Sequence, residues 1–345
     1  MTQGTSATQH TSAAQGSWLV TGGAGYIGSH VARRLRESGR PVVVLDDLSS
    51  GHREFVADGA DEGVRFVEGS ITEPAAVDRA IGAFGEPVAG VVHLAGFKYA
   101  GVSVQRPLHT YTQNVTGMQV LLERLVAHGV SRFVFSSSAA TFGTPDVDLV
   151  TEDTPTRPES PYGESKLIGE WLLRDVALVS DLRHTSLRYF NVVGSGYADL
   201  YDSSPHNLFP LVLKALTEGR VPSVNGTDYP TPDGSCVRDY VHVDDLALAH
   251  VAAAEALEAG RALEPVYNLG SGSGSSVLEI MDAVRRVTGI EFTPERRERR
   301  PGDPARIVAT GELAGRDLGW QMRHDLDAMV ASAWAAWQKV TADAH

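Results

Sequence analysis

The fold is decided by one glycine-rich stretch, Thr21-Gly22-Gly23-Ala24-Gly25-Tyr26-Ile27-Gly28-Ser29-His30. The apolar run Trp18-Leu19-Val20 before it predicts a strand, and apolar positions 31, 32 and 35 after it have helical spacing. Glycine lets the backbone turn sharply and approach a ligand closely, and the free N–H groups at a helix start face an anion. The order strand, glycine turn, helix therefore predicts a phosphate-binding turn, although glycine-rich turns can also serve packing alone.

Size and charge limit the classes of function. The chain has 345 residues, enough for two domains or for one large α/β domain with an appended lobe. Its apolar content of 42% and charged content of 21% are ordinary for a globular protein. The net charge of −13 argues against a nucleic acid or an anionic membrane surface as a partner. A long apolar run that could span a membrane is also missing from the sequence.

Cysteine usage and the first residues indicate the compartment. Cys236 is the only cysteine, so no internal disulfide can form, and a reducing cytoplasm is the expected location. Residues 1–16 are rich in Ser, Thr, Gln, Ala and Gly and lack an apolar core segment. We therefore expect a disordered leader there and no signal peptide.

Beyond the glycine turn, apolar strands alternate with helical patterns. The strands are predicted at 41–47, 64–67, 90–95, 132–135 and 186–190, and the helices at 75–83, 114–128 and 165–176. This alternation predicts a doubly wound parallel sheet of the Rossmann type, whose ligands lie beyond the carboxyl ends of the strands. We expect an NAD-binding domain at 17–190 and a smaller C-terminal substrate-binding lobe at 191–345. Part of 238–272 is expected to return to the first domain.

Two carboxylates end the second predicted strand. Asp46 lies 18 residues beyond Gly28, the distance at which dinucleotide-binding folds place an acidic residue against the adenosine ribose hydroxyls. A carboxylate there repels a 2′-phosphate, so the sequence favours NAD over NADP. The alternative is an aspartate that merely ends a strand.

A tyrosine and a lysine four residues apart carry the expected chemistry. Tyr162 and Lys166 lie on one helical face, and Ser138 follows an earlier strand. A free tyrosine has a pKa of about 10, and a nearby ammonium favours its phenolate form. We expect Tyr162 to act as a base, with Ser138 as its hydrogen-bonding partner. The pair alone also occurs on ordinary helix surfaces.

With these residues in place, the chain resembles the extended short-chain dehydrogenase/reductases and, among them, the UDP-glucose 4-epimerase family. The resemblance runs from about residue 17 to about residue 337. It rests on these stretches: Leu94-Ala95-Gly96-Phe97-Lys98, Ser103-Val104-Gln105-Arg106-Pro107-Leu108, Ser136-Ser137-Ser138-Ala139-Ala140-Thr141-Phe142-Gly143, Leu187-Arg188-Tyr189-Phe190-Asn191, Asp228-Tyr229-Pro230-Thr231-Pro232-Asp233-Gly234, Val237-Arg238-Asp239-Tyr240-Val241-His242-Val243 and Arg299-Arg300-Pro301-Gly302-Asp303.

The resemblance implies a retained NAD, a UDP-sugar substrate and a homodimer. The implied catalytic residues are Tyr162, Lys166 and Ser138. The implied cofactor contacts are Gly22, Gly25, Tyr26, Ile27, Gly28, Asp46, Asp47, Leu48, Ser49, Ser50, Gly51, Ser70, Ile71, Leu94, Ala95, Gly96, Lys98, Asn114, Tyr162, Lys166 and Phe190. The implied substrate contacts are Lys98, Ser138, Tyr162, Asn191, Asn207, Arg238, Arg300 and Asp303. Arginine suits a diphosphate because its guanidinium fork matches phosphate oxygens. Arg300 could instead belong to a solvated charge run.

The resemblance implies a 4-epimerase of UDP-hexoses (UDP-glucose and UDP-galactose), and three departures keep the preferred sugar open. Ser70 stands where the family usually has an aspartate near the adenine. The loop 192–206 is short, and Ile307 occupies the position that gates the sugar pocket. Isoleucine is intermediate in size, so UDP-glucuronate or UDP-N-acetylglucosamine are alternative substrates.

Two other classes of function fit the sequence less well than the epimerase does. A 4,6-dehydratase needs an acid and a base beside the serine, where this chain has Ala139 and Ala140. A non-catalytic NAD-binding protein would have no need for Tyr162 and Lys166 together. The 12 histidines are scattered without metal-ligand spacing, so no metal is expected. His93, within an apolar strand, is expected to be a core residue.

Overall fold

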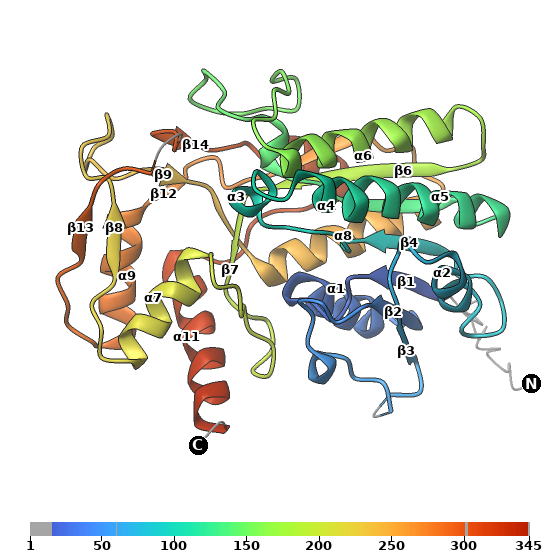
Figure 1. The fold of residues 1–345 in the computed structure, drawn as a ribbon, viewed down its shortest axis with the longest axis horizontal. Coiled ribbons are helices and arrows are strands. Elements are labelled where there is room, and N and C mark those ends of the chain that lie inside the picture. The colour runs from blue at the N-terminus through green and yellow to red at the C-terminus, as the bar shows by residue number, and fades with distance from the viewer. Residues whose placement is uncertain (1–15, 60, 301–302, 344–345) are drawn as a thin grey trace, which may run out of the picture.

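The computed structural model describes residues 16–59, 61–300 and 303–343. The predicted leader lies outside these residues except for Gly16. Within the described chain, a seven-stranded parallel sheet has the order β11-β6-β5-β4-β1-β2-β3 (Figure 1). Its strands are β1 (Trp18–Thr21), β2 (Val42–Asp46), β3 (Val64–Glu68), β4 (Gly90–His93), β5 (Arg132–Ser136), β6 (Arg183–Tyr189) and β11 (Val266–Leu269).

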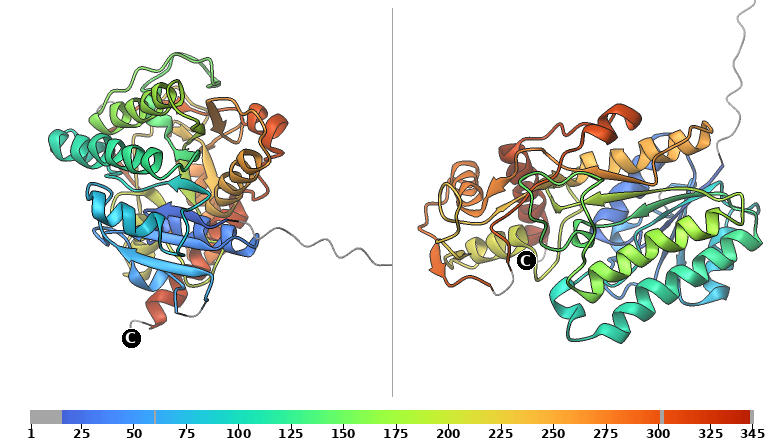
Figure 2. Two further views of the ribbon diagram at one scale, coloured as in Figure 1. Left: turned by 90° about the vertical axis from the view of Figure 1, so that its right-hand side faces the viewer. Right: turned by 90° about the horizontal axis from the view of Figure 1, so that it is seen from above.

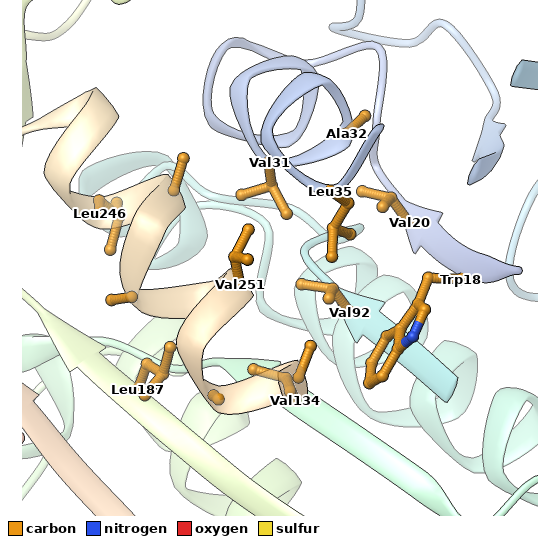
Figure 3. Packing of buried hydrophobic residues seen from close by; sticks show 14 of the residues in the cluster. Trp18, Val20, Val31, Ala32, Leu35, Val92, Val134, Leu187, Leu246 and Val251 are labelled. Carbon is orange, nitrogen blue, oxygen red and sulfur yellow. The ribbon is translucent and has the colours of Figure 1, made fainter. Parts of the chain in front are cut away.

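Helices cover both faces of this sheet because its strands are apolar on both sides. Val20 packs with α1 (Tyr26–Glu37) and α8 (Val243–Glu258) on one face, as Figure 3 shows. Its neighbour Leu19 packs with α2 (Pro74–Ile81), α5 (Gly117–Ala127) and α6 (Pro161–Ala177) on the other. Successive side chains of a strand point to opposite faces, which produces these two cores. The expected doubly wound architecture is confirmed.

The strand order places the ligand crevice. Strand β1 lies between β2 and β4, so the connections from β1 and β4 leave the sheet in opposite directions. In open α/β sheets this switch point, at the carboxyl ends of the strands, is where ligands bind. The short elements at that edge are α3 (Ala100–Ser103), α4 (Pro107–Tyr111), a π-helical turn (Thr112–Thr116) and two 3₁₀ turns (Arg53–Phe55 and Ala139–Thr141).

Helix α6 begins earlier than its apolar pattern predicted. Pro161 occupies its first position, and the Ser160 hydroxyl oxygen accepts a hydrogen bond from the Gly163 N–H at 3.2 Å. Serine at the cap and proline at the first position are a favourable helix start. Tyr162 therefore lies in the first helical turn, which agrees with the expected placement of Tyr162 and Lys166 on one helical face.

A smaller lobe lies at one end of the sheet (Figure 2). It has its own apolar core, which includes Phe209, Ile280 and Met329. Its elements are β7 (Asn191–Val193), α7 (Leu208–Thr217), β8 (Ser223–Asn225), β9 (Val237–Arg238), β10 (Tyr240–His242), β12 (Ser275–Ser276), α9 (Val277–Thr288), β13 (Glu295–Arg297), β14 (Arg306–Ile307) and α11 (Leu326–Asp343), while α10 (Glu312–Leu318) contacts β11 and α8.

Two features of this lobe differ from the secondary structure expected from the sequence. Helix α7 was not predicted. The segment 223–237 is rich in Gly, Ser, Asp, Tyr and Pro, a composition typical of loops, but it contains β8 and the start of β9. Between the lobe's segments, α8 and β11 return to the large sheet. Over the described residues, every helix is too short or too polar to cross a membrane.

Candidate active site

A cleft of about 980 Å³ lies between the carboxyl ends of the sheet and the smaller lobe. Most residues expected to bind cofactor or substrate line it: Gly22, Gly25, Tyr26, Ile27, Gly28, Asp46, Asp47, Ser49, Ser50, Ser70, Ile71, Leu94, Ala95, Gly96, Lys98, Tyr162, Lys166, Phe190, Asn191, Asn207, Arg238, Arg300 and Asp303. Four others, Leu48, Gly51, Asn114 and Ser138, are not among the lining residues. The structure thus gathers residues from both halves of the chain into one site.

The glycine turn is shaped by close backbone approaches. A side-chain carbon at Gly28 would lie 2.1 Å from the Gly22 carbonyl oxygen, and one at Gly22 would lie 2.7 Å from the Ala95 nitrogen. Gly22 also has a φ of +71°, which other residues rarely adopt. The turn leads into α1, whose first N–H groups have no partner within the helix. This cradle, which a Cβ would fill, fits the diphosphate of a dinucleotide.

Asp46 binds the backbone of two loops. Its carboxylate oxygens accept hydrogen bonds from the Ala24 N–H at 3.0 Å and the Leu48 N–H at 2.9 Å. Burial raises the pKa of this carboxyl, and the two N–H groups oppose that rise. Each oxygen keeps a second acceptor site. Asp46 can therefore hold the glycine turn and still accept a ribose hydroxyl in the cleft.

Replacing Asp46 with asparagine should release bound NAD. The amide NH₂ of Asp46→Asn would face a backbone N–H, which leaves a buried donor unpaired at a cost of about 1–3 kcal/mol. We expect about 5- to 100-fold weaker NAD binding, measured by calorimetry on stripped protein. Asp61→Asn is the matched control, because Asp61 also accepts a hydrogen bond from a backbone N–H, that of Gly63 at 2.8 Å, but does not line the cleft. Equal affinity of the two variants would contradict the role given to Asp46.

Asn114 and Ser70 shape the walls of the cleft. The Asn114 Oδ1 accepts a hydrogen bond from the Phe97 N–H at 2.6 Å, and its Nδ2 donates to the Phe97 carbonyl at 3.0 Å and to Ser165 Oγ at 2.8 Å. Asn114 thus holds the backbone of the residue before Lys98 in place. Ser70 lies 2.8 Å from Thr72 Oγ1 and closes a local turn at the wall.

Two of the three expected catalytic side chains, Tyr162 and Lys166, line the cleft, and the third, Ser138, lies next to Tyr162. Lys166 Nζ donates to the Ser136 carbonyl at 2.9 Å and lies 5.8 Å from the centre of the Tyr162 ring. The Ser138 side chain lies next to Tyr162, and its Oγ accepts a hydrogen bond from the Ala140 N–H at 3.1 Å. Tyrosine, serine and lysine thus converge from α6 and from the loop after β5.

The pKa directions differ in part from the expectation. Burial lowers the pKa of Lys166 to about 8. Burial also raises the pKa of Tyr162, and the Ser138 hydrogen bond opposes this rise. The lysine was expected to lower the tyrosine pKa, but its ammonium is directed at the Ser136 carbonyl. In the protein alone, desolvation therefore dominates at Tyr162.

The lysine pKa predicts an alkaline loss of activity. A lysine with a lowered pKa is protonated only below that value, so the Lys166 ammonium is lost as the pH rises through about 8. We expect kcat to hold below this pH and to fall above it. The check is a kcat profile between about pH 6 and 10, bracketing the shifted and ordinary lysine pKa values. A flat profile to the upper limit would contradict the prediction.

Polar side chains from the lobe face the glycine turn across the cleft. Arg238 Nη2 lies 3.5 Å from Asp303 Oδ1, and the Arg238 side chain is only 15% exposed. Asn191 donates to the Asp239 carbonyl at 3.0 Å. Arg300 is exposed but lines the cleft, whereas its neighbour Arg299 pairs with Asp228. The arginine run is therefore divided between the cleft and the surface.

Some cleft residues were missed by sequence reasoning. Asp202 accepts from the Asn207 side chain at 2.7 Å and from the Ser204 N–H at 3.0 Å, and burial raises its pKa. Tyr99 and His206 also line the cleft and meet edge to face, with their ring centres 4.9 Å apart. These residues lie in segments without periodicity, so nothing in the sequence marked them.

Ile307, which was expected to lie at the sugar pocket, is on a strand of the smaller lobe. Ile307, on β14, pairs with Arg238 on β9 and packs with Phe142 and Phe190 beside the cleft. His93 is 1% exposed with Nδ1 2.7 Å from Thr21 Oγ1, which confirms it as a core residue. In residues 16–59, 61–300 and 303–343, no group of three or more His, Cys, Asp or Glu side chains is arranged to hold a metal ion.

The fold and this site together define an extended short-chain dehydrogenase/reductase, with a glycine turn, a ribose-binding carboxylate position and a Tyr-x-x-x-Lys pair. The family described as NAD dependent epimerase/dehydratase matches residues 18–270, and the chain belongs to it.

Similar proteins are named UDP-glucose 4-epimerase. The one from Corynebacterium glutamicum is 43% identical over 321 residues, covering 92% of this chain and 94% of the relative. The one from Streptomyces lividans is 44% identical over 324 residues, covering 92% and 95%. A crystal structure of the Stenotrophomonas maltophila enzyme, with bound NAD and formylated UDP-arabinopyranose, is 37% identical with a TM-score of 0.89, covering 96% and 100%.

Proposed function

We propose that this protein is an isomerase, an NAD-dependent 4-epimerase of UDP-hexoses that interconverts UDP-glucose and UDP-galactose. The observation that carries the proposal is that Tyr162 and Lys166, with Ser138 next to Tyr162, lie at a cleft with a dinucleotide cradle on one wall and Arg238 on the other. Such a site needs a substrate with both a diphosphate and an oxidisable hydroxyl.

The cradle and the Asp46 loop are the residues that would hold NAD. Gly22, Gly25 and Gly28 leave room for the diphosphate, and Asp46 offers acceptors for the adenosine ribose. Lys166, which lies next to Tyr162, would contact the nicotinamide end. When bound, NAD supplies a reversible hydride acceptor, so that C4′ is oxidised transiently to a ketone and reduced again on the opposite face. The net reaction consumes no cofactor.

The chain's own residues handle the proton. Tyr162 would take the proton of the 4′-hydroxyl as a phenolate and return it at the end of the turnover. Ser138 would hold the same oxygen through its hydroxyl while it also bonds Tyr162. The Lys166 ammonium favours the phenolate by its charge, although it lies beside the ring and not at the oxygen. General base catalysis of this kind contributes about 10²- to 10⁴-fold to a rate.

Fixed cations would bind the UDP part despite the acidic chain. Arg238 and Arg300 line the lobe side of the cleft, together with Lys98 from the sheet side. Asp303 holds Arg238 in place through its ion pair at 3.5 Å. A guanidinium fork fits phosphate oxygens, so these arginines supply local charge for a diphosphate in a chain whose net charge is −13.

A C6-oxidised or N-acetylated UDP-sugar is the alternative substrate. A 6-carboxylate would need a donor near 195–197, but the Ser195 hydroxyl is bonded to Tyr197 and Leu200 carbonyls, and these residues do not line the cleft. Ile307 packs on Phe190 beside the cleft and leaves the N-acetyl alternative open. We therefore favour the neutral hexoses.

A substrate panel tests the proposal. UDP-glucose, UDP-galactose, UDP-N-acetylglucosamine and UDP-glucuronate are each incubated with purified protein and scored for inversion at C4′. We expect inversion with the two hexoses, without added NAD, because the cofactor stays bound. Inactivity on all four sugars, or a requirement for NAD in amounts equal to product, would contradict the proposed reaction.

We also infer a homodimer and a cytoplasmic location. Large apolar side chains are exposed on neighbouring segments of the α3–α6 face, including Leu108 at 80% and Trp171 at 47%. A second copy covering this face would remove them from water. The buried thiol of Cys236 fits a reducing compartment. Sedimentation velocity distinguishes the dimer from a monomer.

A further inference from the structure

Three consecutive serines leave β5 in three different directions. The Ser136 Oγ lies 2.6 Å from His250 Nε2 on α8, on one side of the sheet. The Ser137 hydroxyl donates to Glu170 Oε1 at 2.5 Å on α6, on the other side. Ser138 faces Tyr162. Because alternate residues of a strand point to opposite faces, the two serines that do not meet the substrate anchor the third from both sides.

Glu170 ties this loop to two other elements. It lies one turn beyond Lys166 on the helix that also carries Tyr162, and it receives Arg188 Nε at 2.9 Å and Nη2 at 2.5 Å. Arg188 belongs to β6 and packs over the Phe142 ring at 4.8 Å. One carboxylate thus joins β6, α6 and the loop after β5.

The ion pair between Arg188 and Glu170 is buried, and a buried ion pair contributes little to stability. The Arg188 and Glu170 side chains are 6% and 7% exposed. Removing two charges from water costs about as much as their attraction returns, so such a pair adds little net stability, whereas losing one partner leaves a buried charge. In some proteins buried polar groups are retained because they fix one arrangement of the fold. Here the positions fixed are those of the catalytic groups.

We propose that Glu170, with Ser137 and Arg188, is a positioning unit that sets Ser138 and Lys166 relative to Tyr162 for the proposed epimerisation. Ser137 holds the serine loop against α6, so that Ser138 meets the Tyr162 hydroxyl. Glu170 supplies the negative charge one helical turn from Lys166. None of the three needs to touch the substrate.

The charges around Lys166 support the role proposed for Glu170. The titratable groups of this region, besides Lys166, are Tyr162 and Glu170 on α6, His93 on β4, His184, Arg188 and Tyr189 on β6, and His250 on α8. Burial lowers the pKa of His184, and the Glu170 carboxylate opposes that effect. Burial lowers the pKa of His93 to about 3 and that of His250 to about 4, so these two are neutral at pH 7. Burial lowers the pKa of Lys166, and the Glu170 carboxylate opposes that effect.

Two substitutions test the unit, with a matched control. Ser137→Ala removes one hydroxyl and no charge. Glu170→Gln breaks the pair with Arg188. Glu258→Gln is the control, because Glu258 forms a comparable pair with the buried Arg40 at 2.6 Å and accepts one neutral hydrogen bond from Trp18 at 2.6 Å. Arg40 and Glu258 do not line the cleft.

The expected results separate positioning from stability. Ser137→Ala should lower kcat about 10-fold with KM nearly unchanged, and Glu170→Gln about 100-fold, as misplacement of reacting groups does. Glu170→Gln should also move the alkaline limb of kcat to lower pH, because Lys166 loses its opposing charge. Glu258→Gln should lower the unfolding temperature but leave kcat and the limb at wild-type values.

A second readout does not depend on turnover. The ultraviolet difference titration of NAD-loaded wild type against Tyr162→Phe reports the Tyr162 phenolate. In Ser137→Ala this titration should shift to higher pH, because the Ser138 hydrogen bond that favours phenolate is lost. If Ser137→Ala keeps the kcat and the Tyr162 titration of the wild type, the proposal is wrong, even if Glu170→Gln fails to fold. If the wild type epimerises no UDP-hexose, the proposed function fails, and the titration alone decides on the unit.

Discussion

Tyr162→Phe should lower kcat for C4 epimerisation by about 10²- to 10⁴-fold, the usual contribution of a positioned general base. The substitution removes one oxygen from a ring that lies in the first turn of α6, and the polar neighbour that this oxygen loses is the Ser138 side chain. Bound NAD and the unfolding temperature should therefore stay near wild-type values. Steady-state kinetics and the NAD absorbance of the purified variant provide the measurement.

A second tyrosine provides the control. Tyr267 on β11 is fully buried outside the cleft, and its hydroxyl accepts from the Glu264 N–H at 2.9 Å and donates to Asp317 at 3.1 Å. Tyr267→Phe should cost stability of about 1 kcal/mol and leave kcat unchanged. If Tyr162→Phe kept wild-type turnover, the assigned base would be wrong.

Gly28→Ala should abolish NAD retention and destabilise the whole protein. The added methyl would lie 2.1 Å from the Gly22 carbonyl oxygen, a backbone atom that cannot move aside alone. Overpacking of this kind costs about 1–3 kcal/mol or more, and here any relief would come from widening the turn that receives the diphosphate. We expect protein without bound cofactor and a lower unfolding temperature, measured by absorbance and calorimetry.

Gly101→Ala is the matched control for this glycine. Gly101 lies in α3, and a side-chain carbon there would meet no atom within 4 Å. Alanine at a compatible helical position is neutral or stabilises by about 0.4–1 kcal/mol. Retention of NAD by Gly28→Ala would show that the cradle is not where the diphosphate binds.

The sequence predicted the parts of the site that depend on residues close together in the chain. The glycine turn, Asp46 at a strand end, and Tyr162 with Lys166 are each defined by neighbours within about one element's length. The parallel sheet followed from strands that are apolar on both faces. Such signals need no knowledge of distant contacts.

The parts that sequence reasoning missed depend on distant partners. The role of Glu170 depends on Arg188, 18 residues away, and on Ser137, 33 residues away. Asp202 is half-buried, and its neighbours include Asn207, which donates a hydrogen bond to it, and the charge of Lys98. The raised Tyr162 pKa likewise reflects desolvation in the assembled site, which no spacing rule contains.

The return of β11 to the sheet has a consequence for synthesis on the ribosome. Strand β6 ends at Tyr189, but its outer neighbour β11 begins at Val266, and α8, which covers the same face as α1, ends at Glu258. A nascent chain that has emerged only to residue 190 would therefore expose the β6 edge and an uncovered apolar face. Such edges invite pairing with other chains. The nucleotide-binding half of this protein should thus mature late, and chaperones should bind it until residue 269 has left the exit tunnel.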